Sequence, residues 1–497
     1  MKKYTLWVVL SALLLVTLTC KLQEEAQPTP NIIQTTSPSI PPTDTLTSTP
    51  NTLPNTDTPT ITLPFTDTPS FTPSPTLGPP PTATLGFIPA PTSKKWPTPY
   101  FGTPGPTQVT PIPKPAPVIH EPDTITLLLL GSDKRTKSFR TDTMVVVTFQ
   151  PEYHLITLLS IPRDLYVYIP GWKMERINAA FQHGESGYYH GGGPALVKDT
   201  LLYNLGIEVD YYAIVEFSGF KNIIDIFGGV DVPVVCPYTD LRPISPEYDF
   251  NDKDHLYLFT IEPGVVHMDG ELTMWYIRAR KKSSDFDRNR RQQEMLRAMY
   301  SQALRMEMIG KIPELYEEIS QSIKTDFTLL DALILAPQIF DLPSSQVRSF
   351  FISRAEVNPW TTPQKAAVQI PDQQALYYLV RQAFNPPDET EQSRVDLVVE
   401  IWNGTPAYGW EVLASERLHY AGYDAAISVA DRSNYSQTLI FDYTEDQDSK
   451  QAGNLLELFE LDESRLIKNP DPSYPYDYKV VLGSDYDPCF RPKDIQR

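Results

Sequence analysis

The sequence predicts an α/β fold in two domains, preceded by a long segment without any globular pattern. After residue 118, short apolar and β-branched runs alternate with amphipathic stretches, and the same pattern begins again at residue 395. Strand-length runs that alternate with helical patterns are typical of a sheet covered by helices. The third observation is the proline content: 49 of the 497 residues are Pro, so part of the chain is not globular. The remaining length is enough for two hydrophobic cores.

The overall composition argues against two classes of function. The formal net charge is −19 and the pI is about 4.8, so general nucleic-acid binding is not expected. The seven His are scattered and the three Cys lack metal-type spacing, so we propose no zinc site. Three Cys are also too few for a disulfide scaffold, and whether Cys236 and Cys489 pair is left open.

Residues 1–20 are predicted to direct the chain to the membrane. Two lysines precede an apolar run, Leu6–Leu18, that ends at Cys20, as in a secretory signal, so we expect the rest of the chain to be exported. The run is shorter than the ~20 residues of a typical membrane span. Cys20 suits a lipoprotein signal, but Thr17-Leu18-Thr19 matches that signal poorly. Of the two anchors, the sequence favours an uncleaved apolar segment over a lipid-modified Cys20. Either anchor would hold the protein on the outer face of the cell membrane.

Residues 21–117 are predicted to be a disordered stalk. They are rich in Thr, Pro and Ser, with near-repeats such as Thr56-Asp57-Thr58-Pro59 and Thr66-Asp67-Thr68-Pro69. Such a tract has too few apolar residues to offset its conformational entropy, and it favours extended polyproline II structure. A stalk of this kind would hold the folded domains away from the membrane, within the cell wall.

The first domain, residues 118–385, is predicted to begin with three strands of a central sheet. Apolar runs at Ile125–Leu130, Met144–Phe149 and Leu155–Ile161 predict them. The segment between the first two is predicted to be a loop that carries Asp133 and Asp142 among four basic residues. Two carboxylates at strand ends form a site for Mg²⁺, which takes one or two protein carboxylates together with phosphate oxygens. The alternative is a charged hairpin loop on the surface.

The strongest local signal is the stretch Arg278–Arg291, RARKKSSDFDRNRR. It holds seven Arg and Lys against two Asp, a local charge of +5 in an acidic protein. An apolar-periodic run follows, so three of these arginines are predicted to crowd the first turn of a helix, where cations are unfavourable by ~0.3–1 kcal/mol each. Such a conflict points to a binding site for a polyanion, with forked guanidinium groups directed at phosphate oxygens. A solvated basic patch is the alternative.

Five blocks in unbroken order, between about Ile125 and Leu304, resemble the LytR-CpsA-Psr (LCP) family of cell-wall phosphotransferases. The blocks include LLLLGSDKR, FRTDTMVVV, LLSIPRDLYVYIPG, RINAAF and HMDGELTMWYIRARKKSSDFDRNRRQQEML. The resemblance implies an extracytoplasmic fold with a central sheet flanked by helices. It also implies transfer of a glycopolymer phosphate from a polyprenyl-pyrophosphate carrier to peptidoglycan, with Mg²⁺ as cofactor.

The resemblance assigns roles to individual residues. It implies that Asp133 and Asp142 hold Mg²⁺, and that Arg140 and Arg163 contact the pyrophosphate and act in catalysis together with Asp142. The further pyrophosphate contacts that it implies are Arg176, Arg278, Arg280, Arg288, Arg291 and Gln292. The family commonly has Lys at the position of Arg176, and Gly at that of Asp287; we expect Asp287 to cap the helix rather than to face the phosphates.

We therefore expect an enzyme whose partners are a lipid-linked glycopolymer, peptidoglycan and the membrane, and not nucleic acid. A pyrophosphate hydrolase and a non-catalytic, wall-tethered binder of lipid-linked polymer are the alternatives. The predicted Asp133/Asp142 pair favours catalysis, because a binder does not need a metal.

A polar segment, residues 386–394, is predicted to link the first domain to a second one, residues 395–489. The second pattern has the order β-α-β-β-α-β, which indicates a small α+β domain. Its stretches VEIWNGTPAYGWEVLASERLHYAGY and VVLGSDYD resemble the LytR C-terminal domain. The sequence shows no catalytic constellation there, and it does not name the polymer or the acceptor sugar.

Overall fold

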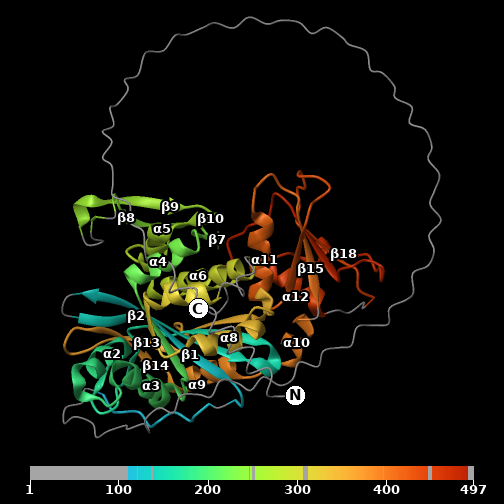
Figure 1. Ribbon diagram of the computed structural model, residues 1–497. Coiled ribbons are helices and arrows are strands. Elements are labelled where there is room, and N and C mark those ends of the chain that lie inside the picture. Colours follow the sequence, from blue (N-terminus) through green and yellow to red (C-terminus); the bar gives the residue numbers. More distant parts are fainter. Residues whose placement is uncertain are drawn as a thin grey trace, which may run out of the picture. The chain divides into compact units, whose positions relative to one another are not determined.

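A six-stranded mixed sheet organises the larger part of the computed structural model (Figure 1). Its strand order is β11-β6-β1-β2-β3-β12; β6 runs parallel to β1 and β12 runs parallel to β3, whereas the other neighbours are antiparallel. The strands are β1 (Ile125–Arg135), β2 (Ser138–Gln150), β3 (Leu155–Ser160), β6 (Tyr211–Glu216), β11 (Ile323–Thr325) and β12 (Val347–Phe351). The structure describes residues 110–490, except 120, 136–137, 246, 249–251, 306–311, 396 and 446–449.

Helices cover both faces of this sheet. Along β2 the side chains alternate: Val145 and Phe149 are buried in the core that includes α6 and α8, whereas Met144 and Val146 are buried in the core that includes α3 and α9. This part of the chain has the helices α2 (Ala180–His183), α3 (Gly192–Leu205), α4 (Phe217–Ile226), α5 (Gly270–Arg278), α6 (Asp285–Arg305), α7 (Ile312–Ser320), α8 (Leu329–Ile339) and α9 (Gln373–Phe384). The mixed sheet flanked by helices confirms the predicted α/β class.

Four two-stranded sheets complete the described residues of this part, and a mostly apolar run, Val230–Val235, predicts only one of their strands. Most of the other strands include polar residues or Pro, such as Asp240, Arg242 and Pro359, so they do not form apolar runs that a sequence pattern would show. The pairs are β4 (Tyr166–Tyr168) with β5 (Met174–Arg176), β7 (Val230–Val234) with β10 (Gly264–Met268), β8 (Tyr238–Pro243) with β9 (Leu256–Ile261), and β13 (Val357–Thr361) with β14 (Ala367–Pro371).

The loop predicted between the first two strands is largely part of the strands themselves. β1 continues to Arg135 and β2 already begins at Ser138, so the two form one long hairpin. Between Gly131 and Ser132 the pairing register shifts: Gly131 faces Thr143, but Ser132 faces Thr141. Asp142 is therefore the extra residue of a β-bulge, which a search for apolar runs does not reveal.

The last residues of the predicted stalk belong to the folded part. The Tyr203 hydroxyl donates a hydrogen bond to the Pro113 carbonyl (2.9 Å), and the Ala116 amide donates to the Tyr203 carbonyl (2.8 Å). The prediction of disorder is therefore wrong for residues 110–117. The predicted anchor and residues 21–109 lie outside the described residues. Among the described residues, no helix has both the length and the apolar character that a membrane span requires.

The C-terminal region forms a second, five-stranded sheet in the order β16-β15-β19-β17-β18 (Figure 1, orange to red). The elements follow the predicted order with one additional short strand, β18. The predicted polar linker includes a helix, α10, because Asp388 caps its first turn through the Glu391 amide. The elements are α10 (Glu389–Val395), β15 (Val398–Asn403), α11 (Trp410–Tyr420), β16 (Asp424–Ser428), β17 (Leu439–Asp442), α12 (Lys450–Leu458), β18 (Leu466–Lys468) and β19 (Tyr478–Leu482).

Both sheets lie within one compact unit of the chain. A disulfide joins Cys236, just after β7, to Cys489, near the end of the described chain. Leu413 of α11 is buried beside Val235 and Cys236. The pairing that the sequence left open is thus present, and it ties the C-terminal region to the two-stranded sheet of β7 and β10.

Candidate active site

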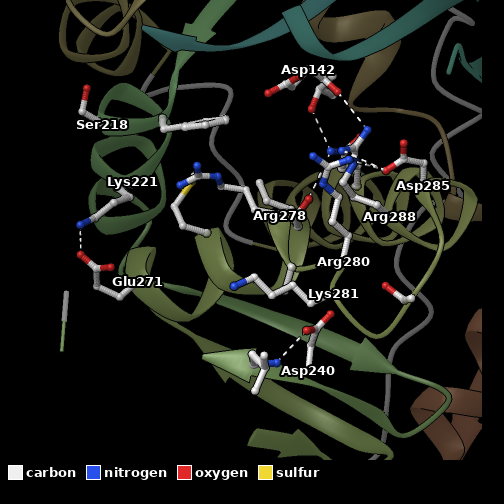
Figure 2. Close-up of a pocket in the computed structure, with 18 of the residues that line it drawn as sticks. Asp142, Ser218, Lys221, Asp240, Glu271, Arg278, Arg280, Lys281, Asp285 and Arg288 are labelled. Carbon is white, nitrogen blue, oxygen red and sulfur yellow. Dashed lines mark hydrogen bonds and ion pairs between the residues drawn. The ribbon is translucent and has the colours of Figure 1, made fainter. Parts of the chain in front are cut away.

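Six of the predicted site residues line a cavity of about 1200 Å³ (Figure 2): Asp142, Arg163, Arg278, Arg280, Arg288 and Gln292. It lies between the bulge in β2, the turn after β3, and the helices α4, α5 and α6. This volume exceeds what a pyrophosphate alone would fill, and it lies slightly above the ~300–1,000 Å³ of typical small-molecule sites, so a larger ligand fits. The charged residues that line it are Asp142, Arg163, Lys221, Asp240, Glu247, Glu271, Arg278, Arg280, Lys281, Asp285 and Arg288.

Arg163 occupies the centre of a group of carboxylates at one end of the cavity. Its Nη1 donates a hydrogen bond to Asp142 Oδ1 (2.8 Å), and its Nε lies 3.5 Å from Asp164 Oδ2 and 3.7 Å from an Asp285 carboxylate oxygen. Burial lowers the pKa of Arg163, but the three carboxylates outweigh burial and raise it overall. The guanidinium therefore stays charged, and its orientation toward the cavity is held from several sides.

Asp285 is the main site residue that sequence reasoning missed. Its Oδ1 accepts a hydrogen bond from Arg280 Nη1 (3.2 Å) and lies 3.4 Å from Arg288 Nη1. Burial raises the pKa of Asp285, but the three surrounding guanidinium groups lower it below its usual value. The Asp285 carboxylate thus contacts three arginines, two from the basic stretch and Arg163 from the turn after β3. Its place between the basic run and the helix start was the available signal.

Arg288 has the least compensated charge in the site. Only 3% of the residue is exposed, and its Nη2 donates to the backbone carbonyl of Asp142 (3.2 Å). Its Nε is buried and has no hydrogen-bond partner among the described residues. Burial lowers the pKa of Arg288 to about 10, because the attraction of Asp285 is opposed by the neighbouring arginines. A buried cation whose charge is only partly compensated favours an anionic ligand.

Arg278 and Gln292 line the same cavity from α5 and α6. The Arg278 guanidinium lies 4.0 Å from the centre of the Phe217 ring, which is the geometry of a cation–π contact. Gln292 Nε2 donates to Thr143 Oγ1 (2.8 Å) and so joins the helix to the bulged strand. The opposite side of the cavity carries a Lys221–Glu271 ion pair, which Figure 2 shows well apart from Asp142.

Arg291 is not a phosphate contact, so this prediction was wrong. The residue is fully buried, and its guanidinium donates to the carbonyls of Tyr276 and Ala279. It also lies over the Tyr238 ring at 4.0 Å. Arg291 therefore points away from the cavity and fixes the turn that carries Arg280. Arg291 lies about one turn further along α6 than Arg288, where backbone carbonyls at the end of α5 accept hydrogen bonds from its guanidinium.

The predicted helix start also needs correction. α6 begins at Asp285, so its first turn is acidic and Arg288 lies in the second turn. Asp287 accepts hydrogen bonds from the Ser284 hydroxyl (2.7 Å) and amide, while the Ser284 hydroxyl accepts from the Asp287 amide (3.0 Å). This reciprocal capping box confirms that Asp287 caps the helix. Two carboxylates, Asp285 and Asp287, therefore lie at the positive end of the helix macrodipole, before any arginine.

Arg176 lies beside the site rather than in the same cavity. Its Nη1 donates to Asp164 Oδ1 (3.1 Å), so it is linked to Arg163 through that carboxylate. It lines a smaller cavity of about 350 Å³ together with Trp172 and His183. A direct contact between Arg176 and a pyrophosphate stays a prediction.

The metal assignment can be examined only through Asp142. The backbones of Asp133 and Arg140 face each other in the β1–β2 hairpin, but their side chains lie outside the described residues. The Asp142 side chain is 28% exposed, and only its Oδ1 is engaged by Arg163. Among the described residues no group of three His, Cys, Asp or Glu is arranged for a metal. One or two carboxylates beside an anion site nevertheless fit Mg²⁺, which completes its shell with phosphate oxygens and water.

Comparison with protein families decides the relationship. The model of the LytR_cpsA_psr family matches residues 106–383, more than half of the 497-residue chain. The chain belongs to the LytR_cpsA_psr family. The resemblance predicted from the sequence blocks is therefore confirmed.

Members of the LytR_cpsA_psr family with curated names are similar to this chain. TagV of Bacillus subtilis, a polyisoprenyl-teichoic acid–peptidoglycan teichoic acid transferase, is 30% identical over 223 residues, 44% of this chain and 53% of TagV. TagT of the same organism, a transferase of the same description, is 32% identical over 45% of this chain and 66% of TagT. This chain thus spans about half to two thirds of these relatives. The crystal structure of B. subtilis TagV is 26% identical, covering 53% of this chain and 97% of that one, with a TM-score of 0.44.

Proposed function

We propose that this protein is an extracytoplasmic phosphotransferase that moves a glycopolymer from a polyprenyl-pyrophosphate carrier to peptidoglycan. The observation that carries the proposal is the convergence of Arg163, Arg278, Arg280 and Arg288 on one cavity beside Asp142. The curated relatives named above, which are teichoic acid transferases, support the same reaction class.

The pyrophosphate would bind at the end of the cavity that Arg163 and Arg288 line. An anionic oxygen beside the Arg288 guanidinium would offset the charge that its buried surroundings compensate only in part. Arg278 and Arg280 follow each other closely at the end of α5 and would contact the same group from the other side. The remaining volume, toward Lys221 and Glu271, would hold the sugars nearest the phosphates.

In the transfer step, an acceptor hydroxyl of peptidoglycan attacks the sugar-bearing phosphorus. A new P–O bond forms to the acceptor, the bond to the bridging oxygen breaks, and polyprenyl phosphate leaves with the electron pair. The hydroxyl proton passes to a carboxylate, for which we propose Asp142. The arginines stabilise the negative charge that grows on the leaving phosphate, which is the main requirement of phosphoryl transfer.

Asp142 and Asp133 would hold Mg²⁺, which when bound neutralises phosphate charge and orients the pyrophosphate. This role accords with the single Asp142 oxygen that Arg163 engages. We further propose that the segment before residue 110 anchors the protein to the cell membrane and extends through the wall, as its apolar run and its Thr/Pro composition suggest.

The direct test uses the full-length chain in detergent with a polyprenyl-pyrophosphate-linked disaccharide, Mg²⁺ and peptidoglycan fragments. Saccharide joined to the glycan through a phosphodiester is the expected product, measured by mass spectrometry. Free saccharide phosphate would instead indicate a hydrolase. Unchanged lipid that stays bound would indicate a non-catalytic binder, and either result would overturn the proposal.

Removal of the metal tests the cofactor. A chelator should abolish transfer, and added Mg²⁺ should restore it. Asp142→Asn should lower kcat/KM by roughly 100-fold or more, because it removes both a metal ligand and the proposed base. Transfer at the wild-type rate in the chelated enzyme would exclude the assigned cofactor.

A further inference from the structure

Beyond the cavity, the middle of helix α6 carries a second group of buried charged residues. Arg290, Glu294 and Arg297 are 6%, 8% and 3% exposed, although each carries a formal charge. Burial of charged side chains is costly unless each has a partner. Their partners therefore show what holds the helix.

Arg297 is held on two sides. On one side its guanidinium donates to the carbonyls of Val347, at the start of β12, and Ser344. On the other side its Nε lies 3.7 Å from Glu416 Oε2, and its guanidinium lies 4.3 Å from the centre of the Tyr420 ring. Glu416 is its only ion-pair partner among the described side chains, and both Glu416 and Tyr420 belong to α11 of the C-terminal region.

Glu416 is well placed for this contact. The side chain is 14% exposed, and its second oxygen lies 3.7 Å from His419 Nδ1. Burial raises the pKa of Glu416, but the contacts with His419 and Arg297 lower it overall, so the carboxylate is charged at neutral pH. The C-terminal region thus supplies the charge that compensates a buried arginine of the catalytic helix.

Within the catalytic part, the same network leads back to the cavity. Arg290 is paired with Glu294, and the Tyr276 hydroxyl of α5 donates to Glu294 Oε2 (2.8 Å). Two residues after Tyr276 comes Arg278, which lines the cavity. Since α6 rises ~1.5 Å per residue, Arg297 lies roughly 14 Å along the helix from Arg288. A shift of α6 at Glu416 would therefore also displace the arginine at the cavity.

We propose that the C-terminal region serves as a positioning element for the catalytic helix, and that Glu416 is its key positioning residue. Glu416 and Tyr420 hold Arg297, which fixes the axial position of α6 and thereby the place of Arg288 and Gln292 in the cavity. This inference rests on the proposed function, since it assigns the C-terminal region a part in pyrophosphate binding. The disulfide between Cys236 and Cys489 ties the same region to the two-stranded sheet of β7 and β10.

The test compares the full-length wild type with Glu416→Gln, which keeps the shape of the side chain but removes its charge. Asp424→Asn is the matched control: Asp424 accepts a hydrogen bond from Ser345 (2.6 Å) across the same contact between the two regions, and its bond goes to the turn before β12 rather than to a charged residue of α6. Binding of inorganic pyrophosphate with Mg²⁺ is measured by calorimetry and transfer by kcat/KM. All measurements are made at a temperature where circular dichroism shows each variant folded.

Glu416→Gln is expected to raise the Kd for pyrophosphate about 10-fold and to lower kcat/KM roughly 10- to 100-fold, as for other residues that orient a binding group. Asp424→Asn is expected to bind pyrophosphate like the wild type, and Glu416→Asp to retain more affinity than Glu416→Gln. A purely structural role would change the melting temperature but not the Kd of the folded protein.

Wild-type affinity and kcat/KM in folded Glu416→Gln would overturn the inference while leaving the proposed function intact. If Glu416→Gln does not fold, Tyr420→Leu tests the same contact through the ring, and wild-type affinity there overturns the inference equally. Failure of the wild type to bind pyrophosphate would instead refute the proposed function, and with it this role of Glu416.

Discussion

Arg288 and Arg291 lie three residues apart on α6, and both are withdrawn from solvent, with 3% and 0% of the residue exposed. Their surroundings differ. The Arg291 guanidinium donates to two backbone carbonyls and to the Ser283 hydroxyl, and it stacks on Tyr238. Arg288 donates to one backbone carbonyl and shares the Asp285 carboxylate with other arginines, whereas the Nε of both Arg288 and Arg291 is buried without a hydrogen-bond partner among the described residues. The two arginines thus differ in how many acceptors surround the guanidinium, and not in burial or sequence motif. The arginine with more acceptors is structural, and the one with fewer is available to a ligand.

This comparison extends along the helix. The cavity end of α6 carries charge that its neighbours leave partly uncompensated, whereas the middle of α6 carries charge that is paired on every turn. A binding site is expected to hold charges that the protein compensates only in part, because a ligand gains the most binding free energy by compensating them. The cavity end of α6 is thus suited to bind a ligand, whereas the middle of α6 stabilises the fold.

The largest expected effect is on stability, from Arg291→Met. The variant removes the Arg291 donor from the buried Tyr276 carbonyl, at ~1–3 kcal/mol, and one of the two donors to the Ala279 carbonyl, which keeps the Tyr238 hydroxyl; it also loses the contact with the Tyr238 ring. The free energy of unfolding should fall by about 3–5 kcal/mol, measured by urea titration. A loss below ~1 kcal/mol would show that Arg291 is not the structural member of the pair.

Arg288→Met should give the opposite result. The kcat/KM for transfer should fall by roughly 100- to 1000-fold, because a preorganised donor to the pyrophosphate is removed. Stability should stay the same or rise: the pKa of Arg288 in the folded protein is below its usual value, so the folded state disfavours the charged form that Met eliminates. If Arg288→Met lowers stability as much as Arg291→Met, the distinction between the two arginines fails.

The smallest effect is expected at the start of the helix. Asp287→Ala removes one half of the capping box with Ser284 and should lower the free energy of unfolding by about 1 kcal/mol. Asp287 bonds to Ser284 and interacts with Arg290, and neither Asp287 nor Arg290 lines the cavity, so kcat/KM should change by less than about threefold. Urea titration and the transfer assay together check this, and a large gain in pyrophosphate affinity would mean that Asp287 repels the phosphates after all.

The regular elements were predictable because local pattern and burial agree in them. The run Gln373–Phe384 with Asp372 before it predicts α9, and the structure has that helix and that cap. The bulge at Asp142 was not predictable, because it depends on how two strands pair rather than on either strand alone. The polar composition of residues 386–394 predicts a linker between the domains. The helix α10 nevertheless begins there, because Asp388 caps its first turn.

The sequence by itself determined the family, the mixed α/β class and the set of charged residues from which the site is built, since these depend on residue types in a fixed order. Only the tertiary structure decided which of those charges meet. It placed Asp285 among three arginines, turned Arg291 into the interior, and set Glu416 of α11 against Arg297 of α6. Periodicity reports which face of a helix is apolar, but contacts between distant segments decide which buried charge is satisfied and which remains free to bind.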